Sequence, residues 1–176
     1  MTDSFLCGWR VRSELHLPEL APWSGDDRTP DVVIRCGEVP DRLDDLVEDS
    51  PFLQIDRHGT CLLRLDNVAA YLVTGPGEVI VAPRPGVGEA EIRVFLLSSV
   101  FGYLCHLRAL FPLHASCVAI NGKAAAFCGP SGAGKSTTAV QLALRGHRLL
   151  ADDVCVIDAH AAGGPRVLPA FPRLKL

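Results

Sequence analysis

The sequence predicts an α/β protein in three parts: a small β-rich N-terminal region, a long helix, and a mixed α/β core. Up to about residue 86, short segments of β-branched and aliphatic residues alternate with Gly, Pro and Asp turn signals. The next segment, 89–110, has no proline and carries apolar residues at helical spacing. Beyond it, a glycine-rich loop joins an apolar strand to a second helix. We therefore place the three parts at 1–88, 89–112 and 113–176.

The N-terminal region is expected to form a small antiparallel sheet. Five segments have the composition of strands, and residues that favour turns separate them. A sixth segment, 41–47, is expected to make one or two helical turns. The five expected strands are 32–34, 52–55, 61–65, 69–74 and 79–81.

The predicted long helix should be buried between the N-terminal sheet and the C-terminal core, because its apolar face is wide. It ends before Pro112, which cannot continue a helix. The segment is apolar enough to suggest a membrane span, but it contains Ser98, His106 and Arg108. An Arg near the centre of a bilayer costs about 2.5 to 3.5 kcal/mol on insertion scales, so we expect a core helix and no membrane partner.

Composition indicates a compact globular protein, with 48% apolar and 21% charged residues. The formal net charge is -3, and no stripe of Lys and Arg runs along the chain, so we expect no nucleic-acid partner. Seven cysteines form an odd set without a C-x-x-C pair, which favours reduced thiols in the core. The first residues lack the pattern of a secretion signal, so we expect a cytoplasmic location.

The C-terminal core begins with a predicted β-hairpin. Apolar segments 115–120 and 123–128 flank Asn121-Gly122, and both of these residues tolerate the positive φ angles that a two-residue hairpin turn requires. The second strand leads directly into Gly129-Pro130-Ser131-Gly132-Ala133-Gly134-Lys135-Ser136-Thr137. This segment satisfies the phosphate-binding pattern G-x-x-x-x-G-K-[ST] in full.

The chemistry of phosphate binding explains these residue types. Glycines let consecutive backbone N–H groups turn toward the phosphates, Lys135 can reach the β and γ phosphates, and the Ser136 hydroxyl can ligate Mg²⁺. The expected helix 136–145 would present its positive N-terminal end to the same anion. The loop therefore predicts binding of a nucleoside triphosphate with Mg²⁺. The alternative, a glycine-rich turn that happens to carry a lysine, does not account for the strand and helix on either side.

Two acidic residues supply the carboxylates that such a site needs. Asp152 and Asp153 follow a short apolar strand, 149–151. One carboxylate, Asp152, can hold Mg²⁺ together with Ser136, while the other accepts the proton of an attacking hydroxyl. An exposed Asp-Asp turn is the structural alternative. His114 directly precedes the hairpin; a histidine at the start of a strand is more often structural than catalytic.

Taken together, His114, the hairpin, the loop and the string from Arg145 to Asp153 resemble the catalytic core of the HPr serine kinase/phosphorylase family. The resemblance covers about residues 114–158. It implies ATP or pyrophosphate as the phosphoryl donor, Mg²⁺ as cofactor, and transfer to a serine of a small protein or peptide. It also implies His114, Lys135, Asp152 and Asp153 as catalytic residues, with Asp153 as the proton acceptor.

The chain also departs from that family. The family continues past the acidic pair with a further metal-ligating Glu and a substrate-capturing loop, which have no counterpart before Leu176. We therefore expect either a fragment or a naturally reduced relative. The N-terminal hundred residues look more like those of stand-alone HPr-kinase-like proteins than like the regulatory domain of HPr kinases.

Two alternative functions stay open. One is a regulatory or scaffold protein that binds nucleotide without turning it over, and the other is a small-molecule P-loop kinase or NTPase, because the loop alone does not specify the acceptor. The leading interpretation is an ATP-dependent serine phosphotransferase. The sequence leaves a homo-oligomer open.

Overall fold

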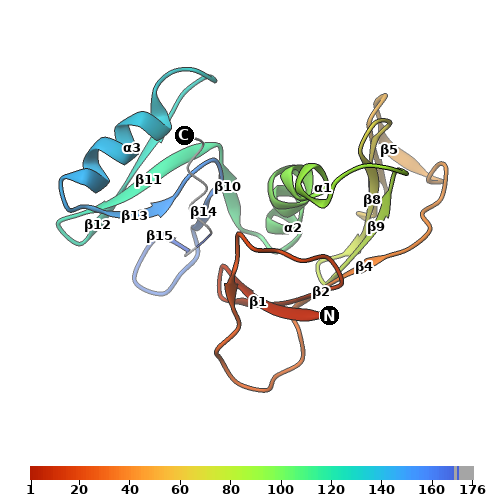
Figure 1. Ribbon diagram of the computed structural model, residues 1–176, viewed down its shortest axis with the longest axis horizontal. Coiled ribbons are helices and arrows are strands. Elements are labelled where there is room, and N and C mark those ends of the chain that lie inside the picture. The colour runs from red at the N-terminus through yellow and green to blue at the C-terminus, as the bar shows by residue number, and fades with distance from the viewer. Residues whose placement is uncertain (169, 171–176) are drawn as a thin grey trace. The chain divides into compact units, whose positions relative to one another are not determined.

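The computed structural model describes residues 1–168 and 170, and its contacts divide the chain into two compact units (Figure 1). The N-terminal unit comprises Met1–Phe5, Trp9–Pro18 and Pro22–Arg108. The C-terminal unit comprises Leu6–Gly8, Glu19–Ala21 and the chain from Ala109 onward. The predicted boundaries at residues 88 and 112 stay a prediction. Each unit is described by itself.

A nine-stranded sheet forms the frame of the N-terminal region, in the order β3-β1-β2-β4-β9-β8-β7-β6-β5. The strands from β5 to β9 follow one another as antiparallel neighbours. Their bounds are Thr2–Leu6 (β1), Trp9–Ser13 (β2), Ala21–Pro22 (β3), Val32–Cys36 (β4), Leu46–Asp49 (β5), Leu53–Asp56 (β6), Cys61–Leu65 (β7), Ala69–Gly75 (β8) and Glu78–Pro83 (β9).

Three expectations for this region are wrong. The sheet is not wholly antiparallel, because β4 lies between β2 and β9 and pairs with both in parallel. Segment 41–47 forms no helical turn; β5 begins at Leu46, after Asp45 at φ 49°. Strands β1 and β2 were not expected, although β2 alternates buried Trp9 and Val11 with half-buried arginines, which is the period of a strand.

The core of this unit lies on both faces of β7, β8 and β9. On one face, Tyr71 is fully buried and its hydroxyl donates a 2.8 Å hydrogen bond to the backbone carbonyl of Ile92. On the opposite face, Leu43 packs with Leu62 and Leu72 in a separate apolar cluster. Leu62 and Leu63 are neighbours in β7 and point to opposite faces of the sheet. Both are buried, because both faces of the sheet are covered.

Three helical segments occupy the position of the predicted long helix: α1 (Glu89–Phe95), a π-helical stretch η1 (Leu96–Val100) and α2 (Phe101–Leu107). They pack on β8 of the same unit (Figure 1). By length and composition alone, Glu89–Leu107 could cross a membrane. That is weak support for a span, because the core helix of a soluble protein passes the same test.

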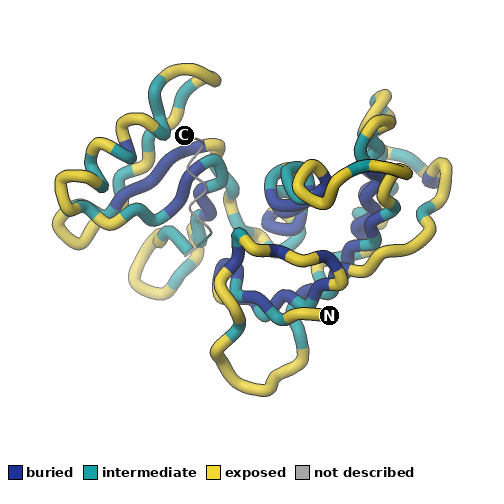
Figure 2. Tube along the Cα trace, in the orientation of Figure 1, coloured by how far each residue is buried: buried dark blue, intermediate teal, exposed yellow. Residues whose placement is uncertain are grey.

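The C-terminal unit contains two three-stranded sheets and one helix. The bounds are Phe111–Leu113 (β10), Ala115–Ile120 (β11), Lys123–Cys128 (β12), Lys135–Leu144 (α3), Arg148–Ala151 (β13), Cys155–Asp158 (β14) and Arg166–Val167 (β15). One sheet has the order β12-β11-β13 and the other β10-β14-β15. Helix α3 packs on the first sheet. Figure 2 shows β11 mostly buried, whereas α3 is mostly half-buried or exposed.

The hairpin prediction is confirmed. Strands β11 and β12 pair from Ala115↔Cys128 to Ile120↔Lys123, with Asn121 and Gly122 at φ 50° and 76° in the turn. Strand β10 was not expected, because Pro112 was taken only as the end of a helix; it pairs with β14.

All seven cysteines are free thiols, as expected for a reduced protein. Five of them are buried, but the expectation of a core position is wrong for Cys36 and Cys128, which are exposed. Burial raises the pKa of Cys155 to about 12. This thiol is therefore protonated at neutral pH and packs as an apolar side chain beside Cys117 and Ala151.

Replacement of Tyr71 by Phe should reduce the free energy of unfolding by about 1 kcal/mol, because the buried hydrogen bond from the Tyr71 hydroxyl to the Ile92 carbonyl would be lost. Urea denaturation followed by circular dichroism measures the change. The matched control is Tyr103→Phe, whose hydroxyl donates to Gly59 at a half-buried position. Its loss should be smaller, and equal losses in the two variants would contradict the role given to burial.

Candidate functional site

Three chain segments meet at one end of the β12-β11-β13 sheet, where β12 and β13 end and β11 begins. Strands β12 and β13 are both antiparallel to β11, so they run in the same direction and end at the same edge. The register pairs Ala115 with Cys128 and Cys117 with Ala151. The residues just beyond these pairs, His114, Gly129 and Asp152, therefore emerge at one edge of the sheet.

The glycine-rich loop lies between the end of β12 and the start of α3. Gly132 and Gly134 have φ 81° and 83°, a left-handed backbone conformation that favours glycine. Gly134 is the N-cap of α3 and has no side-chain cap, which leaves the first backbone N–H groups of this ten-residue helix directed into the loop. The region thus has the backbone geometry that an anion requires at a helix N-terminus.

Lys135 closes the loop on itself. Its ammonium group donates to the backbone carbonyl of Gly129 at 2.9 Å and to that of Pro130 at 3.1 Å. The loop is also held by a hydrogen bond from the Ala133 N–H to the same Pro130 carbonyl, at 3.2 Å. The carbonyls of the loop itself therefore hold the lysine at the mouth of the loop.

Asp152 is the most deeply buried charged residue of this region, with 1% of its surface exposed. Its Oδ1 atom accepts two hydrogen bonds, from Ser116 Oγ at 2.6 Å and from Ser136 Oγ at 2.9 Å. The three residues come from β11, from the first turn of α3 and from the end of β13. One carboxylate oxygen thus connects the loop helix to the sheet.

The Asp153 side chain contacts His114, whereas the two serines hold Asp152. Its backbone is in the left-handed region at φ 71°, within a tight turn in which the Val154 N–H donates to the Asp152 carbonyl at 3.0 Å. Such a γ-turn is strained, and strain of this kind is concentrated at functional sites. The turn separates the two neighbouring carboxylates, so that Asp152 is buried while the Asp153 side chain is 24% exposed.

His114 contacts Asp153 in two ways. Its Nδ1 atom lies 3.3 Å from the carboxylate Oδ1 and 3.1 Å from the backbone carbonyl oxygen of the same residue. A protonated Nδ1 can donate to either acceptor, which orients the ring. The histidine side chain is 61% exposed, so much of the ring is accessible from solvent.

The structure brings together most of the residues predicted for the site. Ser136 and Asp152 are in direct contact, His114 and Asp153 form a second pair, and Lys135 lies over the loop. Thr137 is exposed on α3, and Pro130, Ser131 and Ala133 are exposed at the tip of the loop.

Sequence reasoning missed Ser116. This residue is fully buried, and its hydroxyl makes the shorter of the two hydrogen bonds to Asp152. A signal existed: Ser116 is the one hydroxyl in the apolar strand β11, and buried hydroxyls need a partner. The partner could not be identified without the pairing of β11 with β13.

The donor set of Ser136 and Asp152 fits Mg²⁺, which is commonly held by one or two protein oxygens together with water and substrate phosphates. Among residues 1–168 and 170, there is no group of three or more His, Cys, Asp or Glu side chains arranged to hold a metal ion. A cation at Ser136 and Asp152 would therefore need oxygens from a bound phosphate.

These features define an α/β unit in which a glycine-rich loop, a lysine and the Asp152 carboxylate lie at the N-terminus of a helix. Residues 106–164 match the family model of the HPr serine kinase C-terminal domain. Two HPr kinase/phosphorylases of Limosilactobacillus reuteri, from strain DSM 20016 and from subsp. reuteri strain JCM 1112, are each 48% identical to this chain over 61 residues. The matches support an HPr kinase-like family.

The similarity is confined to part of each protein. Each match covers 33% of this chain and 18% of the relative, so the chain spans less than a fifth of the length of these curated relatives. No solved structure matches the chain significantly. An activity like that of the whole relatives can therefore only be proposed for this chain.

Replacement of Ser116 by Ala should lower the free energy of unfolding by about 1 to 2 kcal/mol, because Asp152 would lose its shorter hydrogen bond inside the protein. Chemical denaturation measures this change. Ser99→Ala is the control, since this serine is exposed and its replacement should alter stability by less than about 0.5 kcal/mol. A stable Ser116→Ala variant would show that Asp152 is not held in this way.

Proposed function

We propose that the C-terminal unit binds ATP with Mg²⁺ and transfers the γ-phosphoryl group to a serine of a small protein or peptide. The observation that carries the proposal is the 2.9 Å contact between Ser136 Oγ and Asp152 Oδ1 beside the glycine-rich loop. It puts a hydroxyl and a carboxylate side by side, as a Mg²⁺-triphosphate site requires. The match to the HPr serine kinase C-terminal domain supports the same chemistry.

Each side chain has a role in this proposal. The loop N–H groups and Lys135 bind the β and γ phosphates, and the lysine charge offsets the negative charge that spreads over the transferred group. Ser136 and Asp152 would hold Mg²⁺, which neutralises phosphate charge when bound.

Asp153 is the proposed proton acceptor. Its partly exposed carboxylate takes the proton of the acceptor serine while the serine oxygen forms a bond to the γ phosphorus, and the bond from that phosphorus to the β–γ bridging oxygen breaks. The products are a phosphoserine and ADP. His114 acts as a positioning residue, because its ring contacts both the carboxylate and the backbone of Asp153.

We also propose that this reaction takes place in the cytoplasm. ATP is available there, and seven free thiols stay reduced in that compartment.

Replacement of Lys135 by Ala should weaken ATP binding by at least about 100-fold, because it removes the one ammonium group at the mouth of the loop in the described part of the chain. Isothermal titration calorimetry with Mg²⁺-ATP measures the affinity. Lys123→Ala is the matched control, because Lys123 lies at the other end of β12. Equal ATP affinity in the Lys135 variant and the unaltered protein would refute the nucleotide site.

Replacement of Asp153 by Asn should preserve ATP binding but reduce phosphoryl transfer by about 100-fold or more, since an amide cannot accept the serine proton. Transfer of label from γ-³²P-ATP to serine-containing peptides measures the reaction, and calorimetry confirms that binding is retained.

Other outcomes of this assay separate the alternatives. Binding of ATP without transfer to any peptide, or hydrolysis alone, would favour a regulatory nucleotide-binding protein. Label on a small metabolite would favour a small-molecule kinase. Full transfer by the Asp153 variant would remove this residue from the proposed mechanism.

A further inference from the structure

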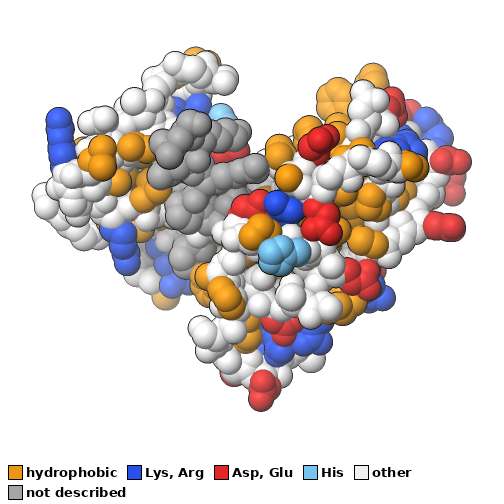
Figure 3. All heavy atoms as spheres, viewed as in Figure 1, with side chains coloured by type: hydrophobic (Ala, Val, Ile, Leu, Met, Phe, Trp, Pro, Cys, Tyr) orange, Lys and Arg blue, Asp and Glu red, His pale blue; other side chains and the backbone are white. Residues whose placement is uncertain are grey.

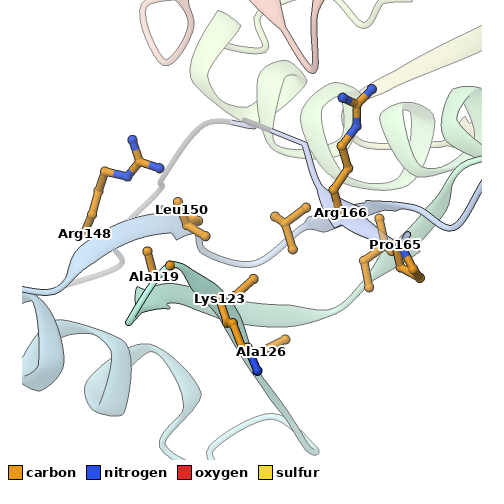
Figure 4. A pocket seen from close by; sticks show the side chains of 11 residues that line it. Ala119, Lys123, Ala126, Arg148, Leu150, Pro165 and Arg166 are labelled. Atoms are coloured by element: carbon orange, nitrogen blue, oxygen red, sulfur yellow. The ribbon is translucent and has the colours of Figure 1, made fainter. Parts of the chain in front are cut away.

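The C-terminal unit has a second hollow, away from the glycine-rich loop. It is a groove of about 590 Å³ whose floor is the sheet face that carries the small side chains of Ala119, Ala124 and Ala126. Figure 4 shows Ala119 of β11 and Ala126 of β12. Ile157 and Val167, from the other sheet, also line the groove. Both sheets of this unit therefore contribute apolar side chains to it.

This groove lies on the sheet face opposite α3. Ser116 points to the helix side, where it contacts Asp152 and through it Ser136. Side chains alternate along a strand, so Cys117 and Ala119 face the other way, as do their register partners Ala126 and Ala124. The groove and the α3 side of the site thus use different faces of one sheet.

Three exposed cations border the groove: Lys123, Arg148 and Arg166. In Figure 4, Arg148 and Arg166 lie at opposite ends of the view, with the alanines between them. Of the three, Arg166 is 3.4 Å from an acidic partner, Asp158. The rim therefore carries a net positive charge.

The positive rim, formed by Lys123, Arg148 and Arg166, is part of a wider separation of charge along the chain. Residues 1–108 contain ten Arg and seventeen Asp or Glu, which gives a net charge of -7, whereas residues 109–176 contain seven Lys or Arg and three Asp, a net charge of +4. On the face shown in Figure 3, acidic side chains are accordingly concentrated on the elements of the N-terminal unit. A ligand of the groove should be acidic.

Two of the cations, Lys123 and Arg148, lie at the end of the β12-β11-β13 sheet remote from the loop. Lys123 begins β12 and Arg148 begins β13, whereas both strands end at the loop edge. From Lys123 to Gly129 there are six residue steps, which span about 20 Å at roughly 3.3 Å per step. An extended chain along β12 would therefore reach from the basic rim to the loop with about six residues.

We propose that the groove binds an extended acidic segment of the phosphoryl acceptor, with carboxylates about six residues from the acceptor serine. The inference rests on the proposed function and names the substrate class of that site. The alanine floor accepts small side chains, and the rim pairs with carboxylates.

An acidic peptide fits the groove better than single-stranded nucleic acid does. Proteins that bind single strands usually stack bases on aromatic side chains, and the described residues that line this groove include no aromatic residue. The small alanine side chains leave room for a peptide backbone to lie close to the sheet.

The test uses the full chain and fluorescein-labelled synthetic peptides of about twelve residues, long enough to cross the sheet. Two peptides carry three acidic residues centred six positions before or after a single serine, and two others carry the same acidic residues directly beside it. Fluorescence anisotropy without ATP measures binding. At least one of the spaced peptides should bind about tenfold more tightly than its counterpart with adjacent acids, and binding should weaken with added salt.

The variant Lys123→Glu/Arg148→Glu should lose this affinity by about tenfold or more, while its affinity for Mg²⁺-ATP should not change. The matched control is Arg145→Glu, because Arg145 is an exposed cation at the C-terminal end of α3, on the other side of the sheet. Equal losses in both variants would indicate non-specific attraction and overturn the proposal.

Further outcomes separate this inference from the proposed function. Peptide binding that depends on the rim, without any phosphoryl transfer, would support the groove and count against the kinase. Phosphoryl transfer to serine peptides that does not depend on the spacing of the acidic residues, and is unchanged in the Lys123→Glu/Arg148→Glu variant, would support the kinase activity. The same result would contradict peptide binding in the groove. Preference for an oligonucleotide over every peptide, or a rim-dependent self-association in sedimentation velocity, would also overturn it.

Discussion

A single carboxylate oxygen organises the candidate site. Asp152 Oδ1 accepts hydrogen bonds from Ser116 and Ser136, so that β11, β13 and the first turn of α3 share one buried point. A buried carboxylate is stable only when its oxygens have donors, and the two hydroxyls provide them. The glycine-rich loop is tied at one end to β12 and at the other to α3, so the position of the helix, and with it of the loop, depends on this contact.

The same contact explains why Asp152 and Asp153, although adjacent in the chain, occupy different environments. Between Asp152, which is turned into the protein, and β14, the chain makes a tight turn through the left-handed backbone of Asp153. That turn presents the second carboxylate at the surface, beside His114. Two adjacent residues of identical chemistry therefore occupy different environments, which suits one of them to hold a cation and the other to exchange a proton.

Local patterns predict the hairpin strands β11 and β12 and the helix after the loop. Asn121-Gly122 specified the hairpin and its register, and the loop pattern located the start of α3 to within one residue. Long-range pairing was not accessible from the sequence. The parallel position of β4 and the contact of Ser116 with Asp152 both depend on strands distant in the chain, and no local propensity encodes them.

The position of Lys135 across the loop has a consequence for how an anion would bind there. Its ammonium group has three N–H donors, and the carbonyls of Gly129 and Pro130 accept from two of them. In the proposed nucleotide site, the third donor could meet a phosphate oxygen without the loss of either contact. The same side chain would therefore tie the turn together and bind its guest at the same time.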